Sequence, residues 1–148
     1  MTSHSQDGPS VGTSQRAASS ESAFDEPPID LAVLEELKSL ASPANPDPLR
    51  EILGLFLSDF PIRYQGLIAS WKARDLPQMH AFAHALKGSA ANVGARRLMS
   101  ILATLDRDLR DGVLDNAPNL MSGIEVEFKL AMTFLQDYLR RCGEAPRI

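Results

Sequence analysis

Residues 83–95 read Ala83-His84-Ala85-Leu86-Lys87-Gly88-Ser89-Ala90-Ala91-Asn92-Val93-Gly94-Ala95. When residues 76–93 are placed on a helical wheel, the apolar side chains gather on one side at the helical period. This apolar stripe consists of Met79, Phe82, Ala83, Leu86, Ala90 and Val93. His84 lies opposite the centre of the stripe. The pattern therefore predicts an amphipathic helix that buries one face and displays a histidine to solvent.

The residues around His84 on the wheel are mostly small or basic. They are His80, Ala81, Lys87, Gly88 and Ala91. A glycine inside a helix costs roughly 1 kcal/mol relative to alanine, so Gly88 suggests a place where a partner must come close. Lys87 can set an ammonium group beside an anionic oxygen. We expect this face to be a docking surface, which the small side chains of Ala81 and Ala91 keep flat.

The order of residues from His84 to Ala95 resembles the signature of histidine-containing phosphotransfer (HPt) domains of bacterial multistep phosphorelays. The resemblance covers about residues 29–141 and includes Asp75 before the histidine helix. It implies that His84 accepts a phosphoryl group on a ring nitrogen, Nε2 in the family. The donor would be the phospho-aspartate of a response-regulator receiver domain, and another receiver domain would take the group on.

The same resemblance assigns supporting roles. It implies that Lys87 orients the phosphate. On the exposed face of the wheel, His80, Ala81, Gly88 and Ala91 are where we expect the partner to dock, and the sequence leaves open whether His80 adjusts docking or a pKa. Mg²⁺ is expected in the receiver partner and no cofactor in this domain. The resemblance therefore predicts a phosphoryl carrier that has no ATP-binding or kinase activity of its own. A hybrid sensor kinase is a further expected partner.

Composition agrees with an all-helical domain. The chain has 148 residues with 44% hydrophobic and only 6% aromatic residues, and leucine and alanine favour helices over strands. The net charge of −4 gives no general electrostatic case for nucleic acid or an anionic membrane. The single cysteine, Cys142, cannot form an internal disulfide. No apolar run has the length of a membrane span, and polar residues follow Met1, so we expect a cytoplasmic protein.

Caps and periodicity predict where the helices lie. Asp30 begins a short helix that runs to about Leu40, with Leu31, Leu34 and Leu37 buried. Asp47 and Pro48 begin a long helix with a kink expected near residues 57–61, because Pro61 interrupts it. Asp75 caps the histidine helix, and Asn92 and Gly94 mark the turn after it. The remaining helices are expected at about Ala95 to Asp111, ended by Gly112, and from Asp115 onward.

Apolar residues recur at spacings of three or four in each long helix, so each offers one face to a core. The predicted stripes are Leu49, Leu53, Phe56, Phe60, Tyr64, Leu67 and Trp71; Leu98, Ile101, Leu102, Leu105 and Leu109; and Ala117, Leu120, Ile124, Phe128, Ala131, Leu135 and Tyr138. Short connections predict an antiparallel up-down-up-down four-helix bundle with an extra short N-terminal helix. We expect a monomer, with residues 1–28 as a disordered tail or interdomain linker, 29–142 as the domain and 143–148 as a short tail.

Other interpretations were weighed. His80 and His84 are spaced to share a metal, but no carboxylate or cysteine lies nearby on the same face of this helix, so no metal site is expected. A histidine-kinase dimerisation segment would carry an acidic residue after the histidine, where Ala85 stands. A phosphorylation-independent adaptor that binds receivers through the bundle surface remains an alternative. Gly88 could instead serve helix packing, and Arg96 and Arg97 could face the partner or be ordinary solvated charges.

Overall fold

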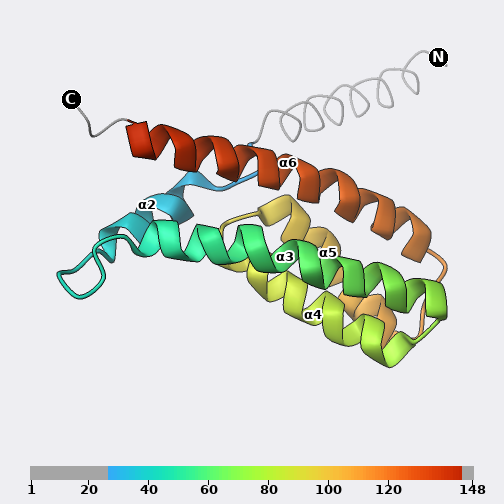
Figure 1. Ribbon diagram of the computed structural model, residues 1–148. Helices are drawn as coiled ribbons and strands as arrows, with labels where there is room; N and C mark the ends of the chain where they lie inside the picture. Colours follow the sequence, from blue (N-terminus) through green and yellow to red (C-terminus); the bar gives the residue numbers. More distant parts are fainter. Residues whose placement is uncertain (1–26, 145–148) are drawn as a thin grey trace, which may run out of the picture.

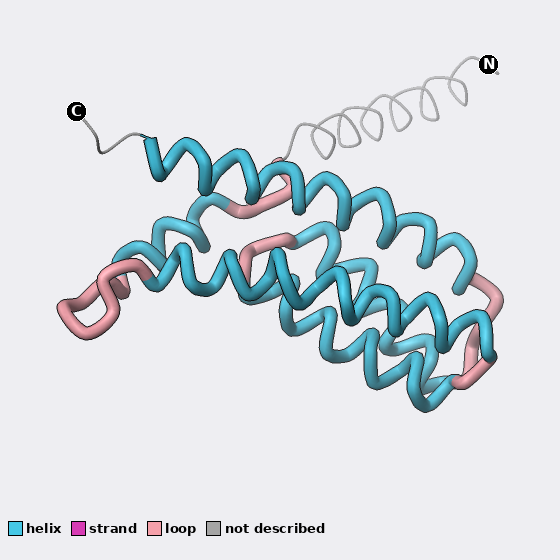
Figure 2. Tube along the Cα trace, viewed as in Figure 1, coloured by secondary structure: helices cyan, strands magenta, loops and turns pink. Residues whose placement is uncertain are grey.

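The computed structural model describes residues 27–144, and every element in this range is a helix (Figures 1 and 2). The helices are α2 (Leu31–Ser39), α3 (Pro48–Ala73), α4 (Leu76–Asn92), α5 (Arg96–Asp111) and α6 (Ala117–Glu144). The predictions for residues 1–26 and 145–148 lie outside the described part. Within the described part, no helix is both long enough and apolar enough to cross a bilayer.

Helices α3 to α6 form the predicted antiparallel bundle. Each packs against the next along the chain, and α6 closes the ring by returning to α3. The short helix α2 packs on α3 at one end of the bundle (Figure 1). The fold class predicted from the sequence is therefore confirmed. The arrangement places the histidine helix α4 between α3 and α5.

Three aspartates begin helices, as predicted. The side chain of Asp30 accepts a hydrogen bond from the Ala32 N–H at 3.0 Å. Asp47 accepts from Arg50 N–H at 3.1 Å and Asp75 from Gln78 N–H at 3.2 Å. Each carboxylate satisfies a backbone donor that the first helical turn leaves without a partner. The Asp75 cap fixes the start of α4 at Leu76, eight residues before His84.

The turn between α4 and α5 is held against α2. Gly94 has φ +76°, a left-handed conformation that glycine adopts without steric cost. Its carbonyl oxygen accepts a hydrogen bond from the Asp30 N–H at 2.7 Å. A Cβ atom at position 94 would also lie 2.9 Å from the Cβ of Val33. The glycine therefore serves both the turn and the close packing of α2.

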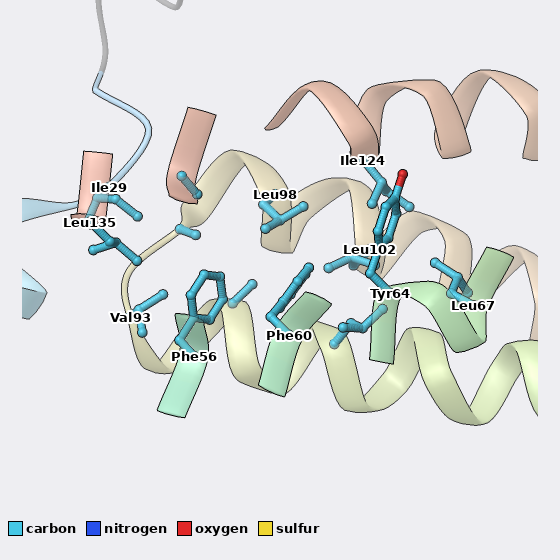
Figure 3. Close-up of a cluster of buried hydrophobic side chains, with 14 of the residues drawn as sticks. Ile29, Phe56, Phe60, Tyr64, Leu67, Val93, Leu98, Leu102, Ile124 and Leu135 are labelled. Atoms are coloured by element: carbon cyan, nitrogen blue, oxygen red, sulfur yellow. The ribbon is translucent and has the colours of Figure 1, made fainter. Parts of the chain in front are cut away.

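The core lies along the bundle axis and is filled by the predicted stripes (Figure 3). Phe60 is fully buried and stacks on Phe128 with ring centroids 4.9 Å apart. Phe56 and Tyr64 extend this aromatic row on α3. Leucines of α4, α5 and α6 complete the core, all fully or almost fully buried: Leu86, Leu98, Leu102, Leu105 and Leu135.

Several local predictions were wrong. Leu31 is 48% exposed, whereas Ile29 is fully buried. Ile29 precedes the Asp30 cap and occupies the position that packs back on the first turns of a helix, which leaves Leu31 on the outer side. Helix α6 begins at Ala117, two residues after Asp115, because the Asn116 carbonyl accepts the first helical hydrogen bond, from Leu120. It continues to Glu144, and the domain bounds predicted from the sequence stay a prediction. Helix α3 continues through Pro61, as its apolar periodicity predicted, and the kink expected near residues 57–61 stays a prediction.

Candidate functional site

His84 lies in the middle of α4 with 68% of its side chain exposed. Opposite it on the helix, Met79, Ala83, Leu86 and Ala90 are fully buried. The helical wheel therefore identified the correct exposed face. A histidine in this position has the solvent access that a reaction with another protein requires.

The small residues near His84 leave the surface open. Ala81, Gly88 and Ala91 are all exposed. A Cβ atom built on Gly88 would meet nothing within 4 Å. Gly88 is thus not required for helix packing, which removes the packing alternative for this glycine. A partner could approach His84 over this side without meeting a bulky side chain.

Beneath the histidine lies a buried carboxylate that the wheel of a single helix did not show. Asp106 comes from α5, and only 1% of its side chain is exposed. Its Oδ2 accepts a hydrogen bond from Lys87 Nζ at 2.8 Å. The same oxygen lies 3.3 Å from Nδ1 of His84. Lys87 and His84 are therefore held by one acceptor on the neighbouring helix.

His80 approaches the other oxygen of the same carboxylate. Its Nε2 lies 2.6 Å from Asp106 Oδ1, and 38% of its side chain is exposed. The contact is short, but its geometry is not that of a well-formed hydrogen bond, so both atoms lack a hydrogen-bond partner within the described residues. The interaction is therefore mainly electrostatic. Its strength depends on the charge of His80.

Asp106 is negatively charged at neutral pH. Burial by itself would raise its pKa, since it disfavours the charged carboxylate. The hydrogen bonds from Lys87 and His84, and the positive charge of Lys87 and of protonated His80, act in the opposite direction. Together they outweigh burial and lower the pKa of Asp106 below its ordinary value. The site thus contains a fixed negative charge directly below the exposed histidine.

This carboxylate determines where His84 carries its proton. An ionised carboxylate can only accept hydrogen bonds, so Nδ1 of His84 faces it as a donor. In a neutral ring the other nitrogen, Nε2, then keeps its lone pair. The arrangement leaves a nucleophilic nitrogen on an exposed side chain and a buried negative charge behind the ring.

The remaining charged candidates lie in other interactions. Arg96 pairs with Asp30 at 3.5 Å, and Arg97 pairs with Glu127 of α6 at 3.0 Å. Neither ion pair involves the group formed by His80, His84, Lys87 and Asp106. The side chains of His80, His84 and Asp106 are not arranged as a set of metal ligands. The two histidines approach different oxygens of Asp106, and Lys87 shares Oδ2 with His84.

A helical bundle that displays a histidine on an exposed helix face has the parts that a histidine phosphotransfer module needs. The chain belongs to the Hpt domain family, which matches residues 51–142. Among similar proteins, histidine-containing phosphotransfer protein 2 of Arabidopsis thaliana is 28% identical over 105 residues, covering 69% of this chain and 67% of the relative. Protein 5 of the same plant is 29% identical over 109 residues, with the same coverage.

A solved structure supports the same assignment. The crystal structure of histidine-containing phosphotransfer protein B from Pseudomonas aeruginosa PAO1 matches with a TM-score of 0.71 and 28% identity. The match covers 79% of this chain and 98% of that chain. The function of the chain is histidine phosphotransfer in a phosphorelay. Members of this family are phosphoryl carriers that interact with the receiver domains and kinases of two-component systems.

Proposed function

We propose that His84 is the residue that carries the phosphoryl group. The observation that supports this most directly is its pairing with Asp106. His84 is exposed on α4, and its Nδ1 faces a buried carboxylate. Nε2 is then the free nucleophile of a neutral ring. His80 is less exposed, and its Nε2 is buried beside the carboxylate, so that nitrogen is less accessible to a partner.

The transfer would proceed as an in-line exchange on phosphorus. The Nε2 lone pair forms the N–P bond while the P–O bond to the receiver's aspartate breaks, and that electron pair returns to the aspartate. Lys87, with 31% of its side chain exposed, would turn its ammonium toward a phosphoryl oxygen and neutralise charge there. Positioning of both partners supplies most of the rate enhancement in such reactions.

The partner we propose is the receiver domain of a response regulator, with a hybrid sensor kinase as a further source of phosphoryl groups. Receivers would dock on the face formed by Ala81, Gly88 and Ala91, with His80 at its edge. Mg²⁺ would belong to the receiver, where the phospho-aspartate forms. This chain would act as a monomeric carrier without kinase activity of its own. One apolar stripe on each long helix supports the monomer, since a single chain then buries its own core.

Substitution of the two helix histidines tests this proposal. A phosphorylated receiver is mixed with the wild-type chain, His84→Gln and His80→Gln, and the acid-labile, base-stable label is measured. We expect His84→Gln to abolish labelling and His80→Gln to retain it, with the helical content unchanged in both. Label that persists in His84→Gln, or that maps to His80, would contradict the assignment.

A further inference from the structure

The close approach of His80 to Asp106 has no role in the transfer described above. The Asp106 side chain has two oxygens with different partners. Oδ2 accepts hydrogen bonds from Lys87 and His84, whereas Oδ1 faces only Nε2 of His80, at 2.6 Å. Oδ1 is buried and has no well-formed hydrogen bond within the described residues. A buried acceptor of this kind responds strongly to a charge placed beside it, because little water screens the interaction.

The form of His80 that fits this short distance carries a proton on Nε2. A ring nitrogen with a lone pair would repel an ionised carboxylate at this separation. The ring is therefore either the neutral form protonated on Nε2 or the cation with both nitrogens protonated. The two forms differ by one full charge against Asp106. The His80 side chain is 38% exposed, so its ring is in contact with solvent as well as with the carboxylate.

We propose that His80 is a positioning residue whose charge sets, through Asp106, how strongly the phosphoryl group is retained on His84. The inference rests on the proposed function, in which His84 is the acceptor. When Nε2 of His84 forms its bond to phosphorus, the proton on Nδ1 stays in place. The ring thereby becomes a cation next to the Asp106 carboxylate. That carboxylate stabilises the phosphorylated form, and anything that reduces its negative charge favours release.

A positive charge on His80 shifts the equilibrium from phosphorylated His84 toward the phosphorylated receiver. A neutral His80 leaves the full negative charge of Asp106 for the phosphorylated ring, so the phosphoryl group is held by this chain. A cationic His80 binds the same carboxylate and competes with the ring, so the group passes more readily to the receiver. Among the described residues, the charged or titratable groups within ion-pair distance of Asp106 are His80, His84 and Lys87, all from α4.

The test measures the equilibrium constant for phosphoryl exchange between the folded chain and one receiver charged with acetyl phosphate. His80→Arg supplies a permanent cation, and His80→Gln supplies a neutral N–H donor. We expect the constant for His80→Arg to lie about tenfold further toward the phosphorylated receiver than that for His80→Gln, since a charge at this distance changes a pKa by about one or more. Gln78→Arg is the control, because it adds the same charge at an exposed position of α4. It should change the constant by less than about threefold, since exposed charges are screened.

A second measurement separates this effect from a general change in structure. Nitrogen-15 NMR of the phosphorylated chain reports whether Nδ1 of His84 carries its proton. We expect that proton to be lost at a lower pH in His80→Arg than in His80→Gln. Equal equilibrium constants in the two variants, or an equal loss of acceptance by both, would overturn the inference about His80 alone. Transfer onto a His84→Gln chain would instead overturn the proposed function on which it rests.

Discussion

Asp106 is a charged residue almost completely removed from water, and the site is built around it. An unpaired carboxylate in such a place would be costly. Here Lys87, His84 and His80 surround it, all from the neighbouring helix α4. The same contacts lower its pKa. One residue thus joins α5 to α4 and lies against Nδ1 of His84.

Neutralising this residue should reduce stability in a pH-dependent way. Because the pKa of Asp106 is lower in the folded chain than in the unfolded chain, its charge stabilises the fold above the unfolded pKa of about 3.9. That contribution is lost as the pH falls through the folded pKa. Asp106→Asn should lower the free energy of unfolding at neutral pH by about 1–3 kcal/mol, since Lys87 and the histidines lose a charged acceptor.

Urea unfolding of Asp106→Asn and of the wild type from pH 7 down to about pH 3 measures this difference. The difference in the free energy of unfolding between the two proteins should become smaller as the pH approaches 3. Glu125→Gln is the control, because its partner Lys129 is largely exposed and surface ion pairs contribute little. If the difference in the free energy of unfolding stayed the same down to about pH 3, the charge of Asp106 would not stabilise the fold.

At the scale of elements, two helix-interior glycines show how packing distinguishes similar sequence features. Gly88 on α4 has open space where a Cβ would stand. Gly66 on α3 lies under the ring of Phe82, and a Cβ there would fall inside contact distance of the ring. The first glycine keeps the surface beside His84 clear. The second lets α3 and α4 approach each other.

Substitution of these two glycines should therefore have opposite effects on stability. Gly88→Gln should hold or raise the free energy of unfolding, by up to roughly 1 kcal/mol, because it reduces the freedom of the unfolded chain. It should also slow transfer from a receiver, since its side chain obstructs the approach to His84. Gly66→Ala should instead lower stability by about 1–3 kcal/mol through overpacking. Thermal unfolding measures the stability of both variants, and the transfer rate from a receiver is measured for Gly88→Gln. A loss of stability in Gly88→Gln would mean that this glycine serves helix packing.

The features that the sequence predicted well are local ones. Caps such as Asp75 depend on a backbone donor three residues away, and the buried stripe of α4 depends on helical spacing alone. Asp106 was not predicted as part of the site, because its role depends on how α5 packs against α4. A signal was nevertheless present: Asp106 lies one turn after Leu102 and next to Leu105, within an otherwise apolar stripe. A carboxylate in a core position needs a partner, and α4 offers three.

At the scale of the whole molecule, the packed bundle holds the helix that displays His84. The α4–α5 turn is fixed to α2 through the hydrogen bond between Asp30 and Gly94, and the aromatic row of α3 fills the core behind α4. Helices α4 and α5 together supply His84 and the carboxylate behind it. His84 is thus presented on a helix held by its neighbours, which is what the proposed transfer with a partner requires.

The central claim is that the intact chain carries a phosphoryl group on His84 between two receivers. The most direct measurement charges the chain with one phosphorylated receiver, isolates it, locates the phosphoryl group by mass spectrometry and then adds a second, unphosphorylated receiver. We expect the group on the peptide that contains His84, and its transfer to the second receiver as the charged chain disappears. A phosphoryl group on any other residue, or a charged His84 that no second receiver can discharge, would contradict the claim.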